Sequence, residues 1–288
     1  MVVVTTVAEM HQIVALARSN GSTVGCIPTM GYLHDGHASL IQAASAKHKL
    51  VVVSIFVNPT QFGPLEDFDK YPRNLERDIQ VVTNAGGSVV FAPTVEEMYP
   101  NGAHSTIHIP HISEILEGAV RPTHFDGVAT VVSRLFEAMQ PDEAFFGQKD
   151  LQQTLIIKHM VESSLINDVH NVSVTVLPTQ REPDGLARSS RNVYLSEKDK
   201  DDALVIYRAL TAASDLVSSG ERNGSRLEQA MLATLATVQA VTVDYAVAVE
   251  AATLQSKDDF YAGDKIALLI AVKLGRTRLI DNIVVAAE

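Results

Sequence analysis

The chain has 288 residues, of which 46% are hydrophobic and 20% are charged, and its formal net charge is −11. This length is enough for one or two domains with a buried core, and the composition is ordinary for a globular protein. The acidic balance argues against a surface for nucleic acid or anionic membranes, because both require a basic face. No apolar run approaches the roughly 20 residues that span a bilayer. We therefore expect neither nucleic acid nor membrane as a partner.

The start of the chain and its cysteine content indicate a compartment. The segment MVVVTTVAEMHQIV has no basic n-region and no small-residue cleavage site, so a signal peptide is not predicted. Cys26 is the one cysteine of the sequence, and its apolar neighbours predict a buried thiol. A cytoplasmic protein is the resulting expectation.

The residues from 23 to 179 alternate between strand-like and helix-like patterns. Continuous β-rich apolar runs at 23–27 and 50–57 are typical of strands buried on both faces of a parallel sheet. The segment 37–48 between them has helical spacing, which completes a β–α–β unit. Further strands are predicted at 88–93, 143–147 and 171–179, and further helices at 74–87, 127–141 and 150–165. This alternation predicts an α/β fold, a Rossmann-like doubly wound parallel sheet with right-handed crossovers.

The composition changes after residue 179, which predicts a second domain. A polar, irregular stretch is followed by helix-like segments at about 197–217 and 225–238 and by strand-like segments at 242–250, 266–274 and 278–286. The tripeptide GRT (275–277) is a plausible hairpin turn. We expect residues 1–179 to form the Rossmann-like ligand-binding domain. Residues 180–288 are expected to form a smaller C-terminal α+β domain that closes over the site.

The segment PTMGYLHDGHASL (28–40) leads from the first of these strands into a helix. Open α/β sheets bind ligands at this carboxyl end of their parallel strands. Gly31 and Gly36 allow the backbone to approach a ligand closely, and Asp35 is a candidate helix cap. His34 and His37 are three residues apart and can share one side of the turn. Two imidazoles beside a helix N-terminus would stabilise charge that develops on phosphate oxygens.

Simpler interpretations of this segment stay open. A histidine at the start of a helix is more often a surface or capping residue. A zinc site would need a third ligand, and no Cys or Glu cluster supplies one. The usual phosphate-binding motifs GxxxxGK[ST] and GxGxxG after a strand are absent from the sequence.

Polar residues also occur in other loops, most of them at strand ends. Asn58 and Gln61 follow the second of these strands and suit a polar organic substrate, and Lys149 follows the fourth and can act as a point charge for phosphate. The segment ARSSR (187–191) places two hydroxyls between two arginines, and RPTHFDGV (121–128) precedes a helix. Each loop alone is more often an ordinary solvated loop. Their convergence favours a site for a phosphate ligand.

Five ordered motifs resemble the pantothenate synthetase (pantoate–β-alanine ligase) family. They are PTMGYLHDGH, SIFVNPTQFGPLEDFDKYPR, RPTHFDGVATVV, FFGQKDLQQ and DGLARSSRNVYLS. The resemblance runs from about residue 20 to 197 and resumes in GRTRLIDNI near the end of the chain. HDGH is also the HxGH signature of the wider nucleotidylyltransferase superfamily, which includes the class I aminoacyl-tRNA synthetases.

The resemblance implies an ATP-dependent ligase that serves pantothenate and coenzyme A biosynthesis. Pantoate would attack the α-phosphate of ATP to form pantoyl adenylate and pyrophosphate, and β-alanine would then displace AMP. The first domain would bind nucleotide and pantoate, with Mg²⁺ on the leaving pyrophosphate and a homodimer as the assembly. Two alternatives stay open, another HxGH nucleotidylyltransferase and a non-catalytic module with this fold.

The resemblance also implies roles for individual residues. His34, His37 and Lys149 would act on the phosphates, with His37 also a proton donor. Gln61 would bind pantoate and β-alanine, and Asp78 matches an acidic position near magnesium. Pantoate would also meet Gln153, Thr29 and Met30. The residues implied to bind ATP are Met30, Gly31, His34, His37, Gly147, Lys149, Asp150, Gln180, Arg188, Ser189, Ser190 and Arg191.

The chain departs from the family pattern at two positions. Arg188 stands where the family usually has an apolar residue, in the loop 188–191 that is the counterpart of the synthetase KMSKS loop. Gln148 stands where a glutamate is frequent.

Overall fold

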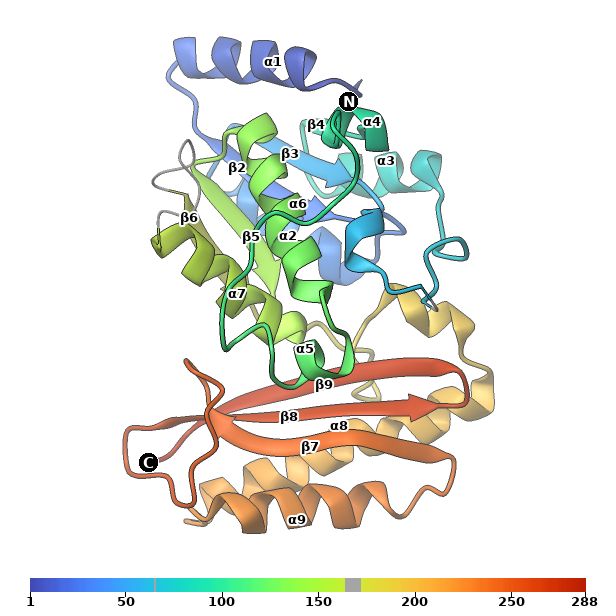
Figure 1. The fold of residues 1–288 in the computed structure, drawn as a ribbon, viewed down its shortest axis with the longest axis vertical. Coiled ribbons are helices and arrows are strands. Elements are labelled where there is room, and N and C mark those ends of the chain that lie inside the picture. Colours follow the sequence, from blue (N-terminus) through green and yellow to red (C-terminus); the bar gives the residue numbers. More distant parts are fainter. Residues whose placement is uncertain (65, 164–171) are drawn as a thin grey trace. The chain divides into compact units, whose positions relative to one another are not determined.

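The computed structural model (Figure 1) describes residues 1–64, 66–163 and 172–288. They form two compact units, Met1–Gly147 with Gln153–Pro178 and Gln148–Gln152 with Thr179–Glu288. The sequence predicts residues 148–152 in the first domain, but this short segment packs with the second unit. The reason is a set of hydrogen bonds from the last strand, described below.

The first unit is a parallel sheet with the strand order β1-β4-β3-β2-β5-β6. The strands are β1 (Val2–Val4), β2 (Val24–Thr29), β3 (Leu50–Ile55), β4 (Val89–Phe91), β5 (Glu143–Gly147) and β6 (Ser173–Leu177). The helices are α1 (Val7–Ser19), α2 (Asp35–Ser45), α3 (Leu75–Asn84), α4 (Val95–Met98), α5 (Glu117–Val120), α6 (His124–Met139) and α7 (Leu151–Glu162), with a 3-10 turn η1 (Pro59–Gln61). The predicted doubly wound parallel sheet is confirmed. Residues 164, 165 and 171, at the ends of a predicted helix and strand, lie outside the described residues.

Strand β3 shows why the apolar runs are continuous. Leu50 and Val52 belong to the core that also contains residues of α1 and α6, whereas Val51 and Val53 belong to the core that contains residues of α2 and α3. Successive side chains of a strand point to opposite faces, so a sheet covered on both faces buries every residue. Full burial of such a side chain stabilises the fold by about 1.5–3 kcal/mol. The predicted buried thiol of Cys26 lies in the first of these cores, and burial raises its pKa.

The order of the strands locates the point where the sheet reverses direction. The chain winds outward through β2, β3 and β4, and then β5 returns to pair with β2 on its other side. In open α/β sheets, ligands bind beyond the carboxyl ends of the strands at this reversal. The segment that carries His34 and His37 follows β2, and the segment that carries Lys149 follows β5.

The second unit is a three-stranded antiparallel sheet with helices packed into one core. Its elements are η2 (Gln148–Asp150), η3 (Ser190–Tyr194), α8 (Glu197–Ser218), α9 (Gly224–Leu235), β7 (Val241–Glu250), β8 (Lys265–Leu274) and β9 (Thr277–Ala286). The strands pair in the order β7-β8-β9, and Leu274 pairs with Thr277 across the predicted turn. Gly275 at this turn has φ +59°, a conformation that glycine adopts without strain. This unit has the predicted α+β architecture.

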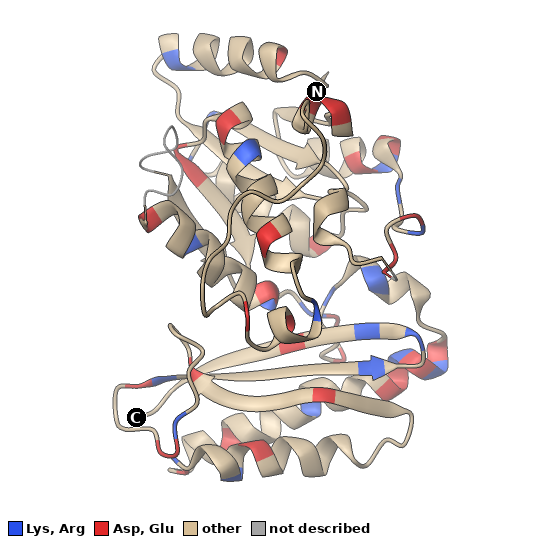
Figure 2. Cartoon of the chain, in the orientation of Figure 1, with Lys and Arg blue, Asp and Glu red and all other residues tan. Residues whose placement is uncertain are grey.

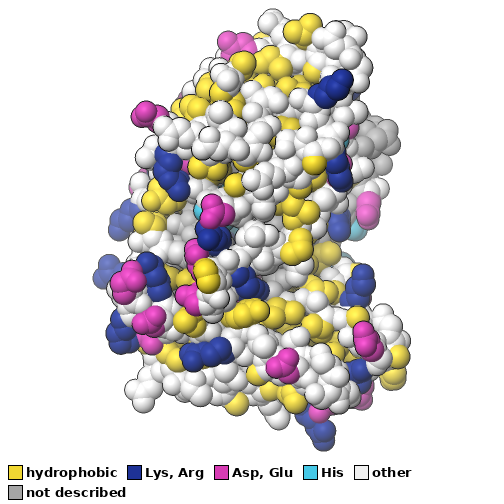
Figure 3. Space-filling view, turned by 180° about the vertical axis from the view of Figure 1, so that it is seen from behind, with side chains coloured by type: hydrophobic (Ala, Val, Ile, Leu, Met, Phe, Trp, Pro, Cys, Tyr) yellow, Lys and Arg dark blue, Asp and Glu magenta, His cyan; other side chains and the backbone are white. Residues whose placement is uncertain are grey.

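Charge is distributed unevenly along the elements. Figure 2 shows acidic residues in the first turns of α8. The negative charges of Glu197 and Asp199 there interact favourably with the positive end of the helix dipole. On the face shown in Figure 3, basic and acidic side chains lie beside one another with hydrophobic patches between them. Among the described residues, no helix is long and apolar enough to cross a membrane.

Candidate active site

His34 and His37 form the first turn of α2 in a reciprocal arrangement. His34 is the N-cap, and its Nδ1 accepts from the Gly36 amide at 3.1 Å. The Nδ1 of His37 accepts from the His34 amide at 3.2 Å, and the two ring centroids are 4.1 Å apart. From the sequence, Asp35 is the expected cap of this helix. That expectation is wrong, because the chain is still extended at His34 and Asp35 is the first helical residue.

The capping bonds determine the tautomer of both imidazoles. A backbone N–H can only donate, so each Nδ1 that receives one must be unprotonated. The proton of each neutral ring is therefore on Nε2. Nε2 is also the nitrogen that neither capping bond uses. Both histidines can thus offer an N–H donor to an anion at the N-terminus of α2, where the helix dipole favours negative charge.

Asp78 fixes the turn that precedes this helix. Its carboxylate accepts the amides of Tyr32 and Leu33, each at 2.7 Å, and the residue is 1% exposed. The turn is tight because Gly31 and Tyr32 have φ +86° and +51°. A Cβ added at Gly31 would lie 3.0 Å from an Asp78 oxygen. Burial raises the pKa of Asp78, while the two amide hydrogen bonds act in the opposite direction.

Gln61 lies in a second polar cluster, beyond the end of β3. Its Nε2 donates to Sδ of Met30 at 3.0 Å, and its Oε1 accepts from Nδ2 of Asn58 at 3.2 Å. Asn58 is 1% exposed, and its Oδ1 accepts from the hydroxyl of Tyr99 at 2.7 Å. The structure therefore brings together Met30 and Gln61, two residues expected to meet pantoate. Tyr99 was not identified from the sequence, because only packing reveals its contact with Asn58.

Thr29 shapes the backbone at the end of β2. Its hydroxyl donates to the Ser54 carbonyl at 2.6 Å and accepts from the Gly31 amide at 3.1 Å. The side chain is thus engaged on both sides within the protein. A ligand at this position would meet the turn that Thr29 supports.

An ion pair joins the segment after Gln61 to the start of α6. Arg121 donates two hydrogen bonds to Glu66, at 2.7 Å and 2.6 Å, and one to Nε2 of His124 at 3.1 Å. Nδ1 of His124 donates to the Gln61 carbonyl at 2.8 Å. Burial and the charge of Arg121 lower the pKa of His124 to about 4, so this histidine is neutral near pH 7. Burial works to raise the pKa of Glu66, but the bonds and charge of Arg121 bring it below its ordinary value.

In the second unit, the Lys149 segment is a 3-10 turn. Nζ of Lys149 lies 3.9 Å from Oδ1 of Asp150, and the lysine side chain is 19% exposed. The backbone carbonyls of Gln148 and Lys149 both accept from Nδ2 of Asn282, each at 2.9 Å. The lysine therefore sits on a backbone that the Asn282 side chain holds, with its ammonium at a partly exposed position.

Several residues expected to contact the nucleotide lie in a short hairpin of the same unit and the turn that follows it. The Arg188 amide donates to the Gln180 carbonyl at 3.0 Å, so these two expected nucleotide contacts are neighbours. The Arg188 guanidinium donates to Glu182 at 3.0 Å. Ser189 caps η3 by accepting from the Arg191 amide at 3.3 Å. The unusual arginine at 188 is thus accommodated by an acidic partner within the hairpin.

Comparisons with known proteins decide the family. The family model for pantoate–β-alanine ligase matches residues 2–284. The chain belongs to this family. It is 48% identical to the pantothenate synthetase of Moorella thermoacetica over 279 residues, which is 97% of this chain and 96% of the relative. It is 46% identical to the Geobacter sulfurreducens pantothenate synthetase over 288 residues, which is the full length of both chains. The prediction of a pantoate–β-alanine ligase is confirmed.

Solved structures of pantothenate synthetases share this fold. The structure from Thermus thermophilus is 44% identical, with a TM-score of 0.90 over 98% of this chain and 99% of that one. The pantoate–β-alanine ligase of Francisella tularensis is 34% identical, with a TM-score of 0.78 over 98% of this chain and 97% of that one. That ligase was crystallised with a β,γ-ATP ligand and β-alanine.

The described residues of this pantoate–β-alanine ligase do not assemble a protein-ligated metal centre. Among residues 1–64, 66–163 and 172–288, no three His, Cys, Asp or Glu side chains are grouped to hold an ion. Asp78, the implied magnesium residue, is buried and uses both carboxylate oxygens on backbone amides. Its geometry fits a support for the His34 turn better than a metal ligand. Gln153, expected near pantoate, is in the first turn of α7 and is partly exposed.

Proposed function

We propose that the chain condenses pantoate with β-alanine to form pantothenate, through a pantoyl-adenylate intermediate and with release of pyrophosphate and AMP. The observation that carries this proposal is the reciprocal capping of α2, which places the proton of both imidazoles on Nε2 at a helix N-terminus. A carboxylate is a poor acyl donor until its oxygen becomes part of a leaving group, and adenylation supplies that leaving group. The first step needs positioning and charge neutralisation more than covalent catalysis.

ATP is the proposed co-substrate. His34, His37 and Lys149 would neutralise charge on its phosphates, and His37 would also act as the proton donor. The remaining proposed nucleotide contacts are Met30, Gly31, Gly147, Asp150, Gln180, Arg188, Ser189, Ser190 and Arg191. Mg²⁺ is proposed to enter with the phosphates of ATP, since the protein side offers no grouped ligands among the described residues.

Pantoate and β-alanine are the other proposed substrates. Gln61 and Met30 would contact pantoate, because their side chains already lie together near the end of β3. Thr29 and Gln153 are the further proposed pantoate residues. Gln61 would also lie next to incoming β-alanine. Residues 180–288 are proposed to close over this site during the reaction.

Formation of AMP tests the proposal. Purified enzyme with ATP, Mg²⁺ and pantoate should exchange pyrophosphate into ATP, and AMP should accumulate only when β-alanine is added. Another nucleotidylyltransferase of the HxGH superfamily would stop at a nucleotidyl product and would not release AMP when β-alanine is added. A protein with neither activity under these conditions would contradict the proposal.

We also propose that the chain acts as a cytoplasmic homodimer joined through the first unit. Val2, Val3 and Leu16 are apolar yet 50%, 41% and 66% exposed, and β1 is an edge strand of the sheet. An exposed apolar edge is suited to contact with a second copy. Light scattering at micromolar concentration should give twice the 31.1 kDa mass of one chain, and a monomer alone would contradict the assembly.

A further inference from the structure

Two buried polar residues stand next to each other in the middle of strand β9. Asp281 is 4% exposed and Asn282 is 2% exposed, and they lie in the GRTRLIDNI segment, which so far has no role in the reaction. Burying a charge or an amide is costly unless partners satisfy it. The partners of these two side chains therefore indicate what the pair does.

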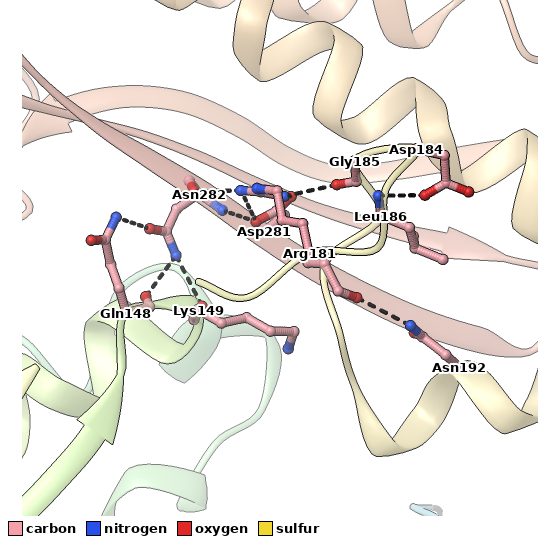
Figure 4. A network of polar contacts seen from close by, with 10 residues as sticks. Gln148, Lys149, Arg181, Asp184, Gly185, Leu186, Asn192, Asp281 and Asn282 are labelled. Carbon is pink, nitrogen blue, oxygen red and sulfur yellow. Dashed lines mark hydrogen bonds and ion pairs between the residues drawn. The ribbon is translucent and has the colours of Figure 1, made fainter. Parts of the chain in front are cut away.

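Asn282 binds the segment that carries Lys149. Its Nδ2 donates to the carbonyls of Gln148 and Lys149, each at 2.9 Å, and its Oδ1 accepts from Nε2 of Gln148 at 3.2 Å (Figure 4). Both N–H groups and the oxygen of the carboxamide are used. The backbone of the 3-10 turn is consequently tied to β9 at the residue that bears the ammonium group.

Asp281 binds the hairpin that leads to the Ser189 loop. Its two oxygens accept from Arg181, at 2.5 Å and 3.0 Å, and Arg181 also donates to the Gly185 carbonyl at 3.2 Å (Figure 4). The Arg181 guanidinium lies 4.3 Å from the ring centroid of Tyr207. Arg181 pairs with Ala187 across the hairpin, directly before the 188–191 loop.

The strand geometry explains how two adjacent residues can serve two segments. Successive side chains of a strand project to opposite faces, so Asp281 and Asn282 point away from each other. The strand itself is held by β8 in an unbroken register from Lys265–Ala286 to Leu274–Thr277. Both segments are thereby anchored to one rigid element. A misplacement of about 1 Å in a reacting group can cost roughly 10²-fold in rate.

We propose that Asp281 and Asn282 are positioning residues. They hold the Lys149 segment and the 180–191 segment in the positions that ATP binding requires. The inference rests on the proposed function, in which both segments contact the nucleotide. Neither residue is proposed to touch substrate. Their effect is expected in the step that uses ATP, and not in the attack of β-alanine on the acyl carbon.

The decisive variant is Asn282→Asp, which keeps the shape of the side chain but loses the N–H donors to two carbonyls. Pantoate-dependent ATP–pyrophosphate exchange should show a KM for ATP raised at least about tenfold. At saturating preformed pantoyl adenylate, the rate with β-alanine should change less than about threefold. Asp281→Asn should give the same split to a smaller degree, because it removes the charge that pairs with Arg181.

Asp244→Asn is the matched control. Asp244 in β7 pairs with Arg278 at 2.6 Å and with Lys273 at 3.7 Å. This change therefore weakens ion pairs that join strands of the same sheet and that do not involve the Lys149 segment or the 180–191 segment. It should leave the KM for ATP within about twofold of the wild type. Circular dichroism melts would establish that each variant is folded. If Asn282→Asp does not fold, Asn282→Ser and Asp281→Asn decide the question.

The outcomes separate the two proposals. Wild-type enzyme without pantoate-dependent exchange would overturn the proposed function. Active wild type with Asn282 variants that match Asp244→Asn would overturn the positioning role alone. Equal damage to both half-reactions would also overturn it, since the pair would then support the fold and not the ATP geometry.

Discussion

His34 and His37 orient each other at the first turn of α2. The His34 amide donates to Nδ1 of His37 at 3.2 Å, and Nδ1 of His34 accepts from the Gly36 amide at 3.1 Å. One ring nitrogen of each residue thus belongs to the helix cap, and the other carries the proton that the chemistry would use. The same two side chains therefore supply local stability and are proposed to serve as a pair of charge-stabilising donors.

The separate roles of Nδ1 in the cap and Nε2 in the reaction can be tested with two substitutions of His37. Asparagine places an acceptor oxygen near the position of Nδ1 and keeps the cap but has no counterpart of Nε2, while alanine lacks both groups. His37→Asn should keep its melting temperature and lose about 10²–10³ in adenylation rate. His37→Ala should lose a similar factor in rate and should also be less stable by about 1 kcal/mol. Melting curves and pyrophosphate exchange measure the two effects, and a His37→Asn enzyme that keeps the wild-type rate would contradict the assignment of Nε2 to the phosphates.

Lys149→Ala should separate the two half-reactions. The ammonium is proposed to neutralise phosphate charge, so pyrophosphate release in single-turnover experiments should fall by about 10²–10³. Preformed pantoyl adenylate should react with β-alanine far closer to the wild-type rate, because no pyrophosphate leaves in that step. Equal damage to both steps would mean that the lysine is not assigned to the phosphates or that its loss disorders the site.

Gln61→Ala should impair both half-reactions. Gln61 bonds to Met30 and Asn58 at the proposed acyl end of the site, so its loss should raise the KM for pantoate and slow the attack of β-alanine. Tyr99→Phe removes only the hydroxyl that donates to Asn58, and we expect the same pattern at a few-fold magnitude. Stopped-flow or quench measurements of each step would show this, and an effect of Gln61→Ala on ATP binding alone would speak against its placement.

Asp78→Asn should reduce adenylation through the backbone and not through a metal. Asparagine has one acceptor oxygen where the Tyr32 and Leu33 amides need two, so the turn before His34 should shift. We expect at least a tenfold fall in kcat for pyrophosphate exchange, with no change in the dependence on Mg²⁺ concentration.

Asp142→Asn is the control for Asp78→Asn. Strand β2 leads into the turn that Asp78 holds. Asp142 accepts the Val24 amide at 2.7 Å, at the opposite end of this strand. Its loss should lower stability by about 1–3 kcal/mol and leave kcat unchanged within about twofold. A shift of the Mg²⁺ requirement in Asp78→Asn would favour the metal role instead.

The neutral His124 should make stability depend on pH. Its pKa is lowered from 6.5 to about 4 in the folded protein, so between these values the unfolded chain binds the extra proton. The free energy of unfolding should therefore fall as the pH drops from about 6.5 to about 4, by about 1.4 kcal/mol per pH unit at most. Above pH 6.5 the contribution of His124 is fully present.

Urea unfolding at pH 7 and pH 4.5 measures this effect. His124→Gln removes the titrating ring, so its stability loss between the two pH values should be about 2 kcal/mol smaller than that of the wild type. His11→Gln, at an exposed position of α1, is the control and should behave like the wild type. Identical losses in all three proteins would contradict a neutral buried His124.

Local pattern was sufficient wherever one segment decides its own structure. The apolar runs of β2 and β3 and the helical spacing of α2 predict the β–α–β unit, because burial on both faces imposes that pattern. The hairpin of β8 and β9 follows from two strand-like segments and a glycine turn in the same way. The five ordered motifs likewise predicted the family, since each is read from consecutive residues.

Local signals also mark elements that the apolar periodicity does not predict. The structure contains α1 within the first twenty residues, where no element is predicted. Thr6 and Glu9 form a capping box at its start, a spacing that can be recognised in the sequence alone. Helix α6 starts at His124, three residues before the predicted start at 127. Thr123 ends the preceding loop in a left-handed conformation, which the apolar periodicity does not predict.

By itself the sequence determined the alternation of strands and helices and the family, and it predicted which residues would carry the chemistry. The tertiary structure decided which residues hold those side chains in place. His34 rather than Asp35 caps α2 because Asp78, from another helix, fixes the turn before it. Lys149 is held by Asn282, and the hairpin before Ser189 is held by Asp281, from the last strand of the chain. Such pairs are distant in the sequence and leave no periodic trace, so only the packing of complete elements brings their hydrogen-bonding groups together.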